Sequence, residues 1–334
     1  MSTIQALQIQ KQGGPEVVEV IPIPAPQLAP GKVIVKNEYA GVNMIDTYHY
    51  GGLYKLPTPI VIGQEASGTV AAVADDVSPS VFKVGDKVVQ YGAGSYSEQQ
   101  LVDAERLVKL PQGIDTRTAA ASFLQGLTAW TLVREAHAVK SGDWVLVTAA
   151  AGGVGLLLCQ MASSLGAKVI GVASTQAKCD LAKQHGAAHT LIYSKDSMDQ
   201  LVAQVKEITN GHGVDAIFDG VGKDTWEACF EMVARKGSIV TFGNASGPIE
   251  PFAPLRLAAK NIKVCRPTLF NYVSTLEERQ QYSAELFEMI TSGKVKINIH
   301  AEYPFTTDGM RKAFSDIKSR GTTGKLVVKI DGSA

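Results

Sequence analysis

The stretch GDWVLVTAAAGGVGLLLCQ, from Gly142 to Gln160, restricts what this chain can form more than any other. An apolar run enters a glycine cluster and a second apolar run leaves it, which is the pattern of a strand, a tight turn and a helix. Read as (G/A)-x-G-x-x-G, the turn runs from Ala150 through Gly152 to Gly155. Such a turn can bind a dinucleotide phosphate, or it can serve only to let the helix pack closely on the strand.

The segments around and after this turn favour the dinucleotide interpretation. Strand-like runs such as WVLVTA, AKVIGVA and VDAIFDGV alternate with helix-like runs such as GLLLCQMASSLG and DQLVAQVKEIT. This alternation predicts parallel strands joined by crossover helices, which is a doubly wound α/β sheet. We expect the helical runs to end in left-handed caps at Gly166, Gly186, Gly211 and Gly237.

The first 110 or so residues have a different pattern. Short β-branched runs such as KVIVKNEYAGV, SGTVAAVA and DKVVQY are separated by turn-forming stretches, so they predict an antiparallel, barrel-like unit. Proline cannot donate to a central ladder, so one proline-rich segment is expected on the outside of this unit. Its prolines are Pro22, Pro24, Pro26 and Pro30.

The chain leaves the alternating pattern again near residue 267. A helical run, TLEERQQYSAELFEMITSGK, is followed by a strand-like run, a second helix and the strand-like run KLVVKI. We expect this tail to fold back onto the β-rich first part. The predicted domains are therefore 1–127 together with 267–334, and 128–266 inserted between them.

Composition and charge exclude several classes of protein. The 334 residues contain 32 Lys plus Arg and 32 Asp plus Glu, so the whole molecule offers no bulk attraction to nucleic acid or to an anionic membrane. The N-terminal sequence lacks a basic segment followed by an apolar core, and no window approaches about 18 uncharged apolar residues. We therefore expect no membrane partner and a cytoplasmic location, with the nucleus as a second location.

The turn after the second strand of the inserted domain indicates which nicotinamide cofactor is bound. An acidic residue about 20 positions after the glycines would bond the ribose 2′-hydroxyl of NADH. Here the turn is GVASTQAKCD, in which Ser174 and Thr175 are followed by Lys178. Small hydroxyls and a cation suit the 2′-phosphate of NADPH, although a solvated helix lysine is the commoner role of such a residue. We predict NADPH because the lysine coincides with the missing acid.

Three stretches carry a resemblance that covers essentially the whole chain. They are GDWVLVTAAAGGVGLLLCQMASSLGAKVIG, AGVNMIDTYHYGGLY and SRGTTGKLVV. They resemble the medium-chain dehydrogenase/reductase superfamily, specifically its zinc-free quinone oxidoreductases, the branch that includes zeta-crystallin. The resemblance implies a GroES-like β-rich catalytic domain, made of 1–127 and 267–334, and a Rossmann NADPH-binding domain over 128–266.

Two positions argue against a metal. Zinc dehydrogenases of the superfamily hold a catalytic zinc with a Cys and a His in the first domain, and this sequence has Asn43 and Gln64 there. The four-cysteine structural lobe is missing too, since no cysteine precedes Cys159. We predict no metal site. Without a Lewis acid a quinone is the favoured substrate, because its ring spreads the incoming charge and gains aromaticity on reduction.

The implied activity is metal-free transfer of one or two electrons from the nicotinamide of NADPH to a quinone. The product is then a semiquinone or a hydroquinone. An NADPH-dependent alkenal or enone double-bond reductase is the alternative of the same class. An AU-rich RNA-binding protein of the zeta-crystallin type is the alternative of a different class, and the zero net charge argues against it as the main role. The resemblance also implies a homodimer, with NIKVCRPTL as the edge strand that continues the sheet.

By resemblance, Asn43 and Tyr48 match residues beside the nicotinamide, and Tyr54 matches a residue of the substrate pocket. Asn43 offers amide donors to a carbonyl oxygen, and the tyrosines offer a stacking face and a hydroxyl, or else serve only in packing. Asp46 is interpreted as structural, holding this loop. Glu65 is interpreted either as a buried hydrogen-bonding group or as a catalytic one.

The remaining matches concern the cofactor. The pyrophosphate loop is matched by Ala151, Gly152, Gly153, Val154 and Gly155. The adenosine and 2′-phosphate end is matched by Ser174, Lys178 and Tyr193, with Arg320 reaching from the tail. The nicotinamide side is matched by Phe242, Gly243, Asn244, Leu269 and Phe270. Thr128 begins the hinge helix and is expected to face the cofactor, although a surface ion pair for Arg320 and a plain helix hydroxyl for Thr128 are equally good interpretations.

Overall fold

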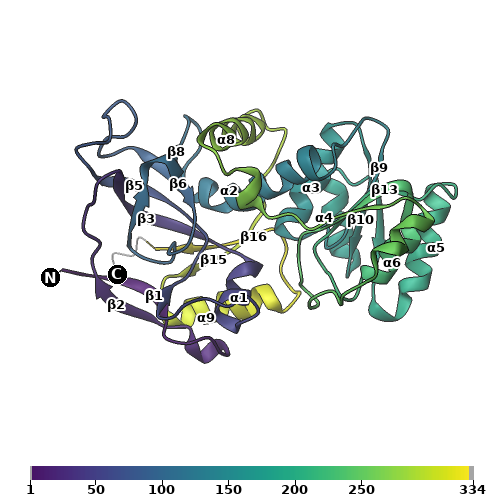
Figure 1. Cartoon of the computed structure of the whole chain (residues 1–334), viewed down its shortest axis with the longest axis horizontal. Coiled ribbons are helices and arrows are strands. Elements are labelled where there is room, and N and C mark those ends of the chain that lie inside the picture. Colours follow the sequence, from purple (N-terminus) through teal and green to yellow (C-terminus); the bar gives the residue numbers. More distant parts are fainter. Residues whose placement is uncertain (1, 331–334) are drawn as a thin grey trace. The chain divides into compact units, whose positions relative to one another are not determined.

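The structure is a computed structural model that describes residues 2–330 of the chain (Figure 1). The chain forms two compact units. The first unit consists of Met1–Leu124, Thr275–Thr291 and Ile297–Ala334, apart from the terminal residues outside the described part. The second unit consists of Gln125–Ser274 and Ser292–Lys296.

These boundaries differ from the expected ones at three short segments, of which the first, residues 125–127, belongs to the second unit instead of the first. Residues 267–274 belong to the second unit, because they directly follow the strand Lys263–Cys265, and the Tyr272 hydroxyl lies 3.9 Å from the Cys265 sulfur. Residues 292–296 also belong to it, because the Gln160 side chain accepts from the N–H of Lys296 at 2.8 Å and donates to its carbonyl at 3.1 Å.

The first unit contains two sheets. A three-stranded sheet has the order β2-β1-β4, and a seven-stranded sheet has the order β15-β16-β3-β5-β6-β8 with β7 paired to β3. All pairings are antiparallel except that of β15 with β16. The strands are β1 (Thr3–Ile9), β2 (Val20–Pro24), β3 (Lys32–Val42), β4 (Ile60–Val61), β5 (Glu65–Val73), β6 (Lys87–Tyr91), β7 (Gln99–Asp103), β8 (Leu107–Lys109), β15 (Ile299–Pro304) and β16 (Lys325–Lys329). The proline-rich β2 lies at an edge of its sheet, as its missing donors require.

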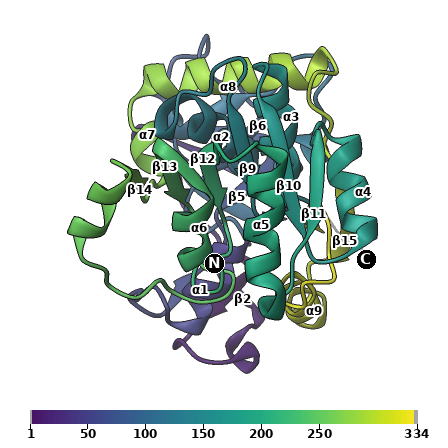
Figure 2. The same cartoon turned by 90° about the vertical axis from the view of Figure 1, so that its right-hand side faces the viewer.

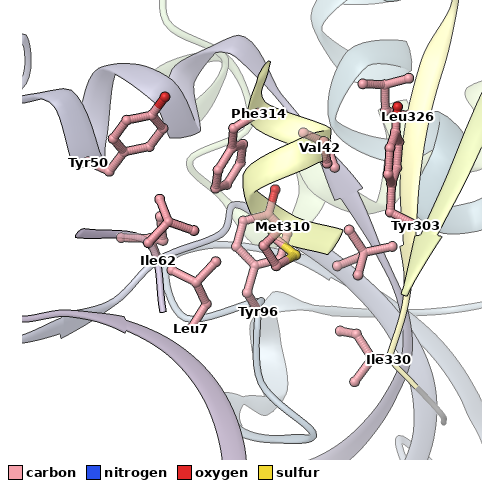
Figure 3. Close-up of a cluster of buried hydrophobic side chains, with 14 of the residues drawn as sticks. Leu7, Val42, Tyr50, Ile62, Tyr96, Tyr303, Met310, Phe314, Leu326 and Ile330 are labelled. Atoms are coloured by element: carbon pink, nitrogen blue, oxygen red, sulfur yellow. The ribbon is translucent and has the colours of Figure 1, made fainter. Parts of the chain in front are cut away.

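A core of the first unit combines aliphatic and aromatic side chains, some of them from α1 (Met44–Gly51) and α9 (Thr307–Lys318) (Figure 3). Phe314 of α9 packs against Tyr50 of α1 and against Tyr96, with ring centroids 5.2 and 6.0 Å apart. Buried aromatic pairs of this kind add stabilisation beyond the apolar area that they bury. The core therefore fixes α1, the helix that carries Tyr48 and is preceded by Asn43.

The second unit is built on a six-stranded parallel sheet of order β11-β10-β9-β12-β13-β14. Its strands are β9 (Trp144–Val147), β10 (Lys168–Ala173), β11 (His189–Ile192), β12 (Val214–Asp219), β13 (Val233–Thr241) and β14 (Lys263–Cys265). On one face lie α3 (Gly153–Ser164) and α4 (Gln176–Gln184), and on the other α5 (Met198–Ile208) and α6 (Trp226–Met232) (Figures 1 and 2). The predicted doubly wound sheet is confirmed, and the strand order reverses between β9 and β12.

The other α-helices are α2 (Thr116–Thr131), which continues into the π-helical turn Leu132–Ala136, α7 (Leu269–Tyr272) and α8 (Leu276–Thr291). Within residues 2–330, no helix is both long and apolar enough to cross a bilayer. The phenylalanine rings of Phe123 in α2 and Phe287 in α8 stack with centroids 5.9 Å apart, which attaches α8 to the first unit.

The glycine caps were predicted correctly at three positions out of four. Gly166, Gly186 and Gly211 have left-handed φ values of 87°, 98° and 79°. The expectation for Gly237 is wrong, because α6 ends at Met232 and Gly237 lies inside β13. The end of α6 is instead satisfied by the Lys260 ammonium, which donates to three carbonyl oxygens, those of residues 230, 231 and 233.

Candidate functional site

The glycine turn connects β9 to α3 at the carboxyl edge of the parallel sheet. The chain turns left-handed at Ala149, with φ 48°, and the N–H of Gly152 donates to the Ala149 carbonyl at 2.8 Å. A Cβ on Gly155 would lie 2.3 Å from that carbonyl oxygen, so only glycine lets α3 begin this close to the strand. Gly155 therefore serves packing, whereas the first N–H groups of α3, at Gly153 and Val154, lack acceptors within the helix and suit an anion.

The residues predicted for the 2′-phosphate lie at the ends of the two neighbouring strands. Thr175 caps α4, and its hydroxyl accepts from the N–H of Lys178 at 3.4 Å. Ser174 is exposed, Lys178 is half-buried, and partial burial lowers the pKa of Lys178. Tyr193 follows β11, and its N–H donates to the Ala173 carbonyl at 2.8 Å. The carboxyl ends of β10 and β11 thus bring Ser174, Lys178 and Tyr193 onto the same edge of the sheet.

The loop after β13 holds the residues predicted for the nicotinamide side. Its first residue, Phe242, donates its N–H to the Asp219 carbonyl at 2.8 Å, and a Cβ on Gly243 would lie 2.3 Å from the Gly220 carbonyl oxygen. With its amide turned to satisfy both neighbours, Asn244 donates to the Gly243 carbonyl at 3.0 Å and accepts from Arg266 at 3.1 Å. The loops after β12 and β13 are therefore packed backbone to backbone.

The Arg266 guanidinium also donates to the Thr241 carbonyl, at 2.8 Å. The Thr241 hydroxyl is buried at the carboxyl end of β13, and no described residue offers it a hydrogen bond. An unsatisfied hydroxyl at this edge, together with the open start of α3 and the lysine of α4, forms a donor set that fits a bound dinucleotide.

The remaining cofactor candidates belong to different units of the structure. Leu269 is half-buried and Phe270 exposed in α7, and both belong to the second unit. Thr128 also belongs to this unit, but it is half-buried in the last turn of α2 and does not begin that helix as expected. Arg320 is exposed, follows α9 with a left-handed φ of 60°, and belongs to the first unit.

In the first unit, α1 and the turn after it place the two predicted tyrosines together. Tyr48 and Tyr54 meet edge to face with centroids 5.5 Å apart, and the N–H of Tyr54 donates to the Tyr48 carbonyl at 3.2 Å. Both rings are half-buried. The Gln12 amide fixes this turn by donating to the carbonyls of His49 and Tyr54, each at 2.7 Å.

Asn43 begins α1 and its side chain is fully engaged. The amide nitrogen donates to the Gly41 carbonyl at 3.1 Å and to the Glu65 carboxylate at 2.9 Å, and the amide oxygen accepts from the Lys325 ammonium at 2.7 Å. Both amide hydrogens are thus used inside the unit. Donation from this amide to a substrate oxygen, as we expected from the sequence, would require one of these bonds to break.

The side chains around Asn43 form a buried polar cluster. Lys325 and Glu65 pair at 2.5 Å, and their side chains are 1% and 0% exposed. The Asp46 carboxylate accepts from the N–H of Asn43 at 2.9 Å and from the Tyr96 hydroxyl at 2.6 Å. Asp46 therefore holds this loop, as its sequence position indicated, and burial raises its pKa to about 7. Glu65 acts as a buried hydrogen-bonding group rather than as an exposed carboxylate.

Sequence reasoning missed two groups. Lys325 bonds to Asn43 across 282 positions, and its only signal was a lysine heading the apolar run KLVVKI. Asp219, at the end of β12, accepts from the Thr148 hydroxyl at the end of β9. The sequence signal for Asp219 was an acidic residue at the carboxyl end of the buried run AIFD. Parallel strands place ligand-binding residues at this end.

The residues at the two zinc positions do not fit zinc. Asn43 is committed to Glu65 and Lys325, and the Gln64 amide lies 3.5 Å from the His49 ring. The Glu65 carboxylate is neutralised by an ammonium group. Among residues 2–330, no three His, Cys, Asp or Glu side chains cluster as metal ligands. Amide and ammonium groups are not zinc ligands, so we derive no step through a metal.

A GroES-like β-rich unit combined with a Rossmann sheet defines the class of medium-chain dehydrogenases and reductases. One family model, described as zinc-binding dehydrogenase, matches residues 153–291, and another, described as alcohol dehydrogenase GroES-like domain, matches residues 29–112. A probable quinone oxidoreductase of Schizosaccharomyces pombe is 42% identical over 323 residues, which are 96% of this chain and 96% of the relative. The chain belongs to the quinone oxidoreductase family of this superfamily, as its resemblance indicated.

Two further comparisons define the range of the family. A quinone oxidoreductase of Escherichia coli, whose crystal structure was solved as a complex with NADPH, has a TM-score of 0.92 and 37% identity, covering 98% of this chain and 100% of that one. A 2-haloacrylate reductase of Burkholderia is 35% identical over 341 residues, which are 97% of this chain and 98% of the relative. The expected fold class is confirmed, and the relatives include a protein named 2-haloacrylate reductase.

Proposed function

We propose that the protein is an NADPH-dependent quinone reductase whose second unit binds the cofactor. The observation that carries the proposal is the carboxyl edge of the parallel sheet. There the open start of α3 and the turn of Ser174 and Lys178, which lacks an acid, lie at the ends of adjacent strands. NADPH supplies a hydride from its nicotinamide when bound. The NADPH complex of the Escherichia coli relative supports this assignment.

We assign the cofactor-binding residues by their positions on this edge. The loop residues 151–154 receive the pyrophosphate, with Gly155 letting α3 begin close to the strand, and Ser174, Lys178 and Tyr193 receive the adenosine and its 2′-phosphate. Residues 242–244 and 269–270 border the nicotinamide. Thr128 and Arg320 complete the proposed set, and neither belongs to the carboxyl edge of the sheet.

The substrate residues of the proposal are Tyr48 on α1 and Tyr54 in the turn that follows it. Their edge-to-face pair offers an aromatic surface of the kind that a flat quinone stacks on. Asn43 contributes by fixing the start of α1 through its bonds to Glu65 and Lys325. A quinone delocalises incoming charge through its own ring, so hydrogen bonds suffice where a ketone would need a Lewis acid.

The relation to 2-haloacrylate reductase favours one second candidate, reduction of a conjugated double bond. Steady-state oxidation of NADPH with phenanthrenequinone and, separately, with a conjugated alkenal distinguishes the two. We expect kcat/KM to be at least about tenfold higher for the quinone, a difference of about 1.4 kcal/mol in transition-state stabilisation. Equal or faster turnover of the alkenal would make the double-bond reductase the correct assignment.

Lys178→Ala tests the cofactor assignment. Loss of a charge-assisted contact to the 2′-phosphate should raise KM for NADPH by about tenfold or more and change KM for NADH by less than about twofold. Lys183→Ala is the matched control, because Lys183 is an exposed lysine in the last turn of the same helix. Equal effects of Lys178→Ala on both cofactors would remove its proposed role.

We further propose a homodimer that extends the six-stranded sheet. The support is that β14, within the predicted segment NIKVCRPTL, is an edge strand of that sheet. Light scattering should give twice the chain mass, and a monomer at micromolar concentration would refute this.

By family analogy, we also propose RNA binding and a cytoplasmic or nuclear location. Filter binding over a salt series, with and without NADPH, tests the first, and the absence of salt-dependent affinity removes it.

A further inference from the structure

The Asp219 carboxylate is buried at the point where the strand order of the sheet reverses. One of its oxygens accepts from the hydroxyls of Thr148 and Thr225, both at 2.8 Å, and from the N–H of Val221 at 3.3 Å. The other accepts from the N–H of Gly222 at 2.9 Å. Burial raises the pKa of Asp219, yet every partner is a donor, which suits the ionised carboxylate.

These bonds connect two loops that follow different strands. The Thr148 hydroxyl, directly before the glycine turn, also accepts from the N–H of Gly220 at 3.0 Å. The carboxylate therefore ties the end of β9 to the loop after β12.

The loop after β12 is in turn bonded to the loop after β13. The N–H of Ser246 donates to the Val221 carbonyl at 2.8 Å, and that of Lys223 donates to the Gly247 carbonyl at 3.2 Å. With the tight Gly243 to Gly220 contact, the three loops form one hydrogen-bonded body. No comparable bond from Asp219 reaches the turn of Ser174 and Lys178 among the described contacts.

We infer that Asp219 is a positioning residue, which holds the pyrophosphate loop after β9 and the nicotinamide-side loop after β13 at one fixed spacing. The inference rests on the proposed function, because it assumes that NADPH lies across both loops. Asp219 acts through Thr148 and through the backbone, and it leaves the adenosine end of the edge untouched.

This division predicts a selective defect. NADPH must contact both loops, so its affinity depends on their spacing. Adenosine 2′,5′-bisphosphate carries only the adenosine end and contacts the turn of Ser174 and Lys178. Loss of the Asp219 bonds should therefore weaken NADPH binding and leave binding of the bisphosphate unchanged.

Asp219→Asn and Thr148→Val test the inference by titration calorimetry with both ligands. Asp219→Asn retains the volume but presents an amide nitrogen to a donor, and Thr148→Val removes the bridging hydroxyl. We expect Kd for NADPH to rise by about tenfold with either variant and Kd for the bisphosphate to change by less than about twofold. Thr148→Ser, which keeps the hydroxyl, should restore NADPH binding.

Asp215→Asn is the matched control, because Asp215 lies at the other end of β12 and accepts from the Trp144 N–H at 2.8 Å. It should change the two Kd values by the same small factor. The inference alone would be overturned if the wild-type protein binds NADPH tightly but Asp219→Asn and Thr148→Val raise Kd for both ligands by the same factor. Failure of the wild-type protein to bind NADPH would instead overturn the proposed function and, with it, this inference.

Discussion

At the scale of single residues, the ammonium group of Lys325 shows how a charge is kept inside the first unit. It lies 2.5 Å from the Glu65 carboxylate and 2.7 Å from the Asn43 amide oxygen. Burying an ion pair of this kind contributes little net stability, but removing one partner leaves an uncompensated buried charge. The main effect of Lys325 on stability is therefore to compensate the buried charge of Glu65.

Lys325→Met should lower the free energy of unfolding by about 3–5 kcal/mol, because Glu65 loses its counter-ion while its side chain stays buried. Lys329→Met, an exposed lysine of the same strand, is the control and should change it by less than about 0.5 kcal/mol. Urea denaturation measures both values. Similar values for the two variants would mean that the pair is solvated.

Asp46 gives a pH dependence of known sign. Its pKa is raised from 3.8 to about 7, chiefly by burial, so the folded chain binds a proton that the unfolded chain has released between these pH values. The free energy of unfolding should therefore fall as the pH rises from about 4 to about 7, by up to about 1.4 kcal/mol per pH unit. Asp46→Asn should remove this contribution in urea titrations across that range, and an unchanged pH slope would contradict the assignment.

At the scale of elements, the start of α3 depends on one close approach. A Cβ on Gly155 would meet the Ala149 carbonyl oxygen at 2.3 Å, a backbone atom that cannot move away without displacing the turn. Gly155→Ala should lower the unfolding free energy by about 1–3 kcal/mol and weaken NADPH binding, because the helix start moves. Gly51→Ala is the control, since a Cβ there meets no atom within 4 Å. Thermal unfolding with and without NADPH measures both effects, and equal melting temperatures for the two variants would contradict this packing argument.

Elements with a strong local period were predictable from the sequence, and their ends and partners were less so. The parallel sheet and the glycine turn follow from patterns that lie within about 20 residues. The prediction for Gly237 was wrong because the residue with a left-handed φ, 68°, is its neighbour Lys236. The side chain of Lys260 caps the end of α6, where a glycine was expected to do so. The partner of Asn43 lies 282 positions away, so no local pattern could show that its amide is already engaged. The sequence thus predicted which residues belong to the candidate site, but not which hydrogen bonds their side chains make.

At the scale of the whole molecule, the three tryptophans provide a reporter for one unit alone. Trp130, Trp144 and Trp226 all belong to the second unit, and Trp226 packs against Phe230 and Phe252 in its core. Intrinsic tryptophan fluorescence therefore follows unfolding of the unit to which we assign the cofactor. A ligand that binds only the folded state stabilises it by RT ln(1 + [L]/Kd), which is about 2.7 kcal/mol at 100 times Kd.

NADP⁺, used in place of the strongly absorbing reduced form, should raise the tryptophan-monitored urea midpoint in proportion to the logarithm of its concentration. NAD⁺ at the same concentration should raise it less, because it offers no 2′-phosphate to Lys178. In Lys178→Ala the two ligands should become nearly equal, since the discriminating charge is gone. A midpoint that shifts equally with both ligands in the wild-type protein would show that this edge of the sheet does not discriminate the 2′-phosphate, and the assignment of NADPH would have to be abandoned.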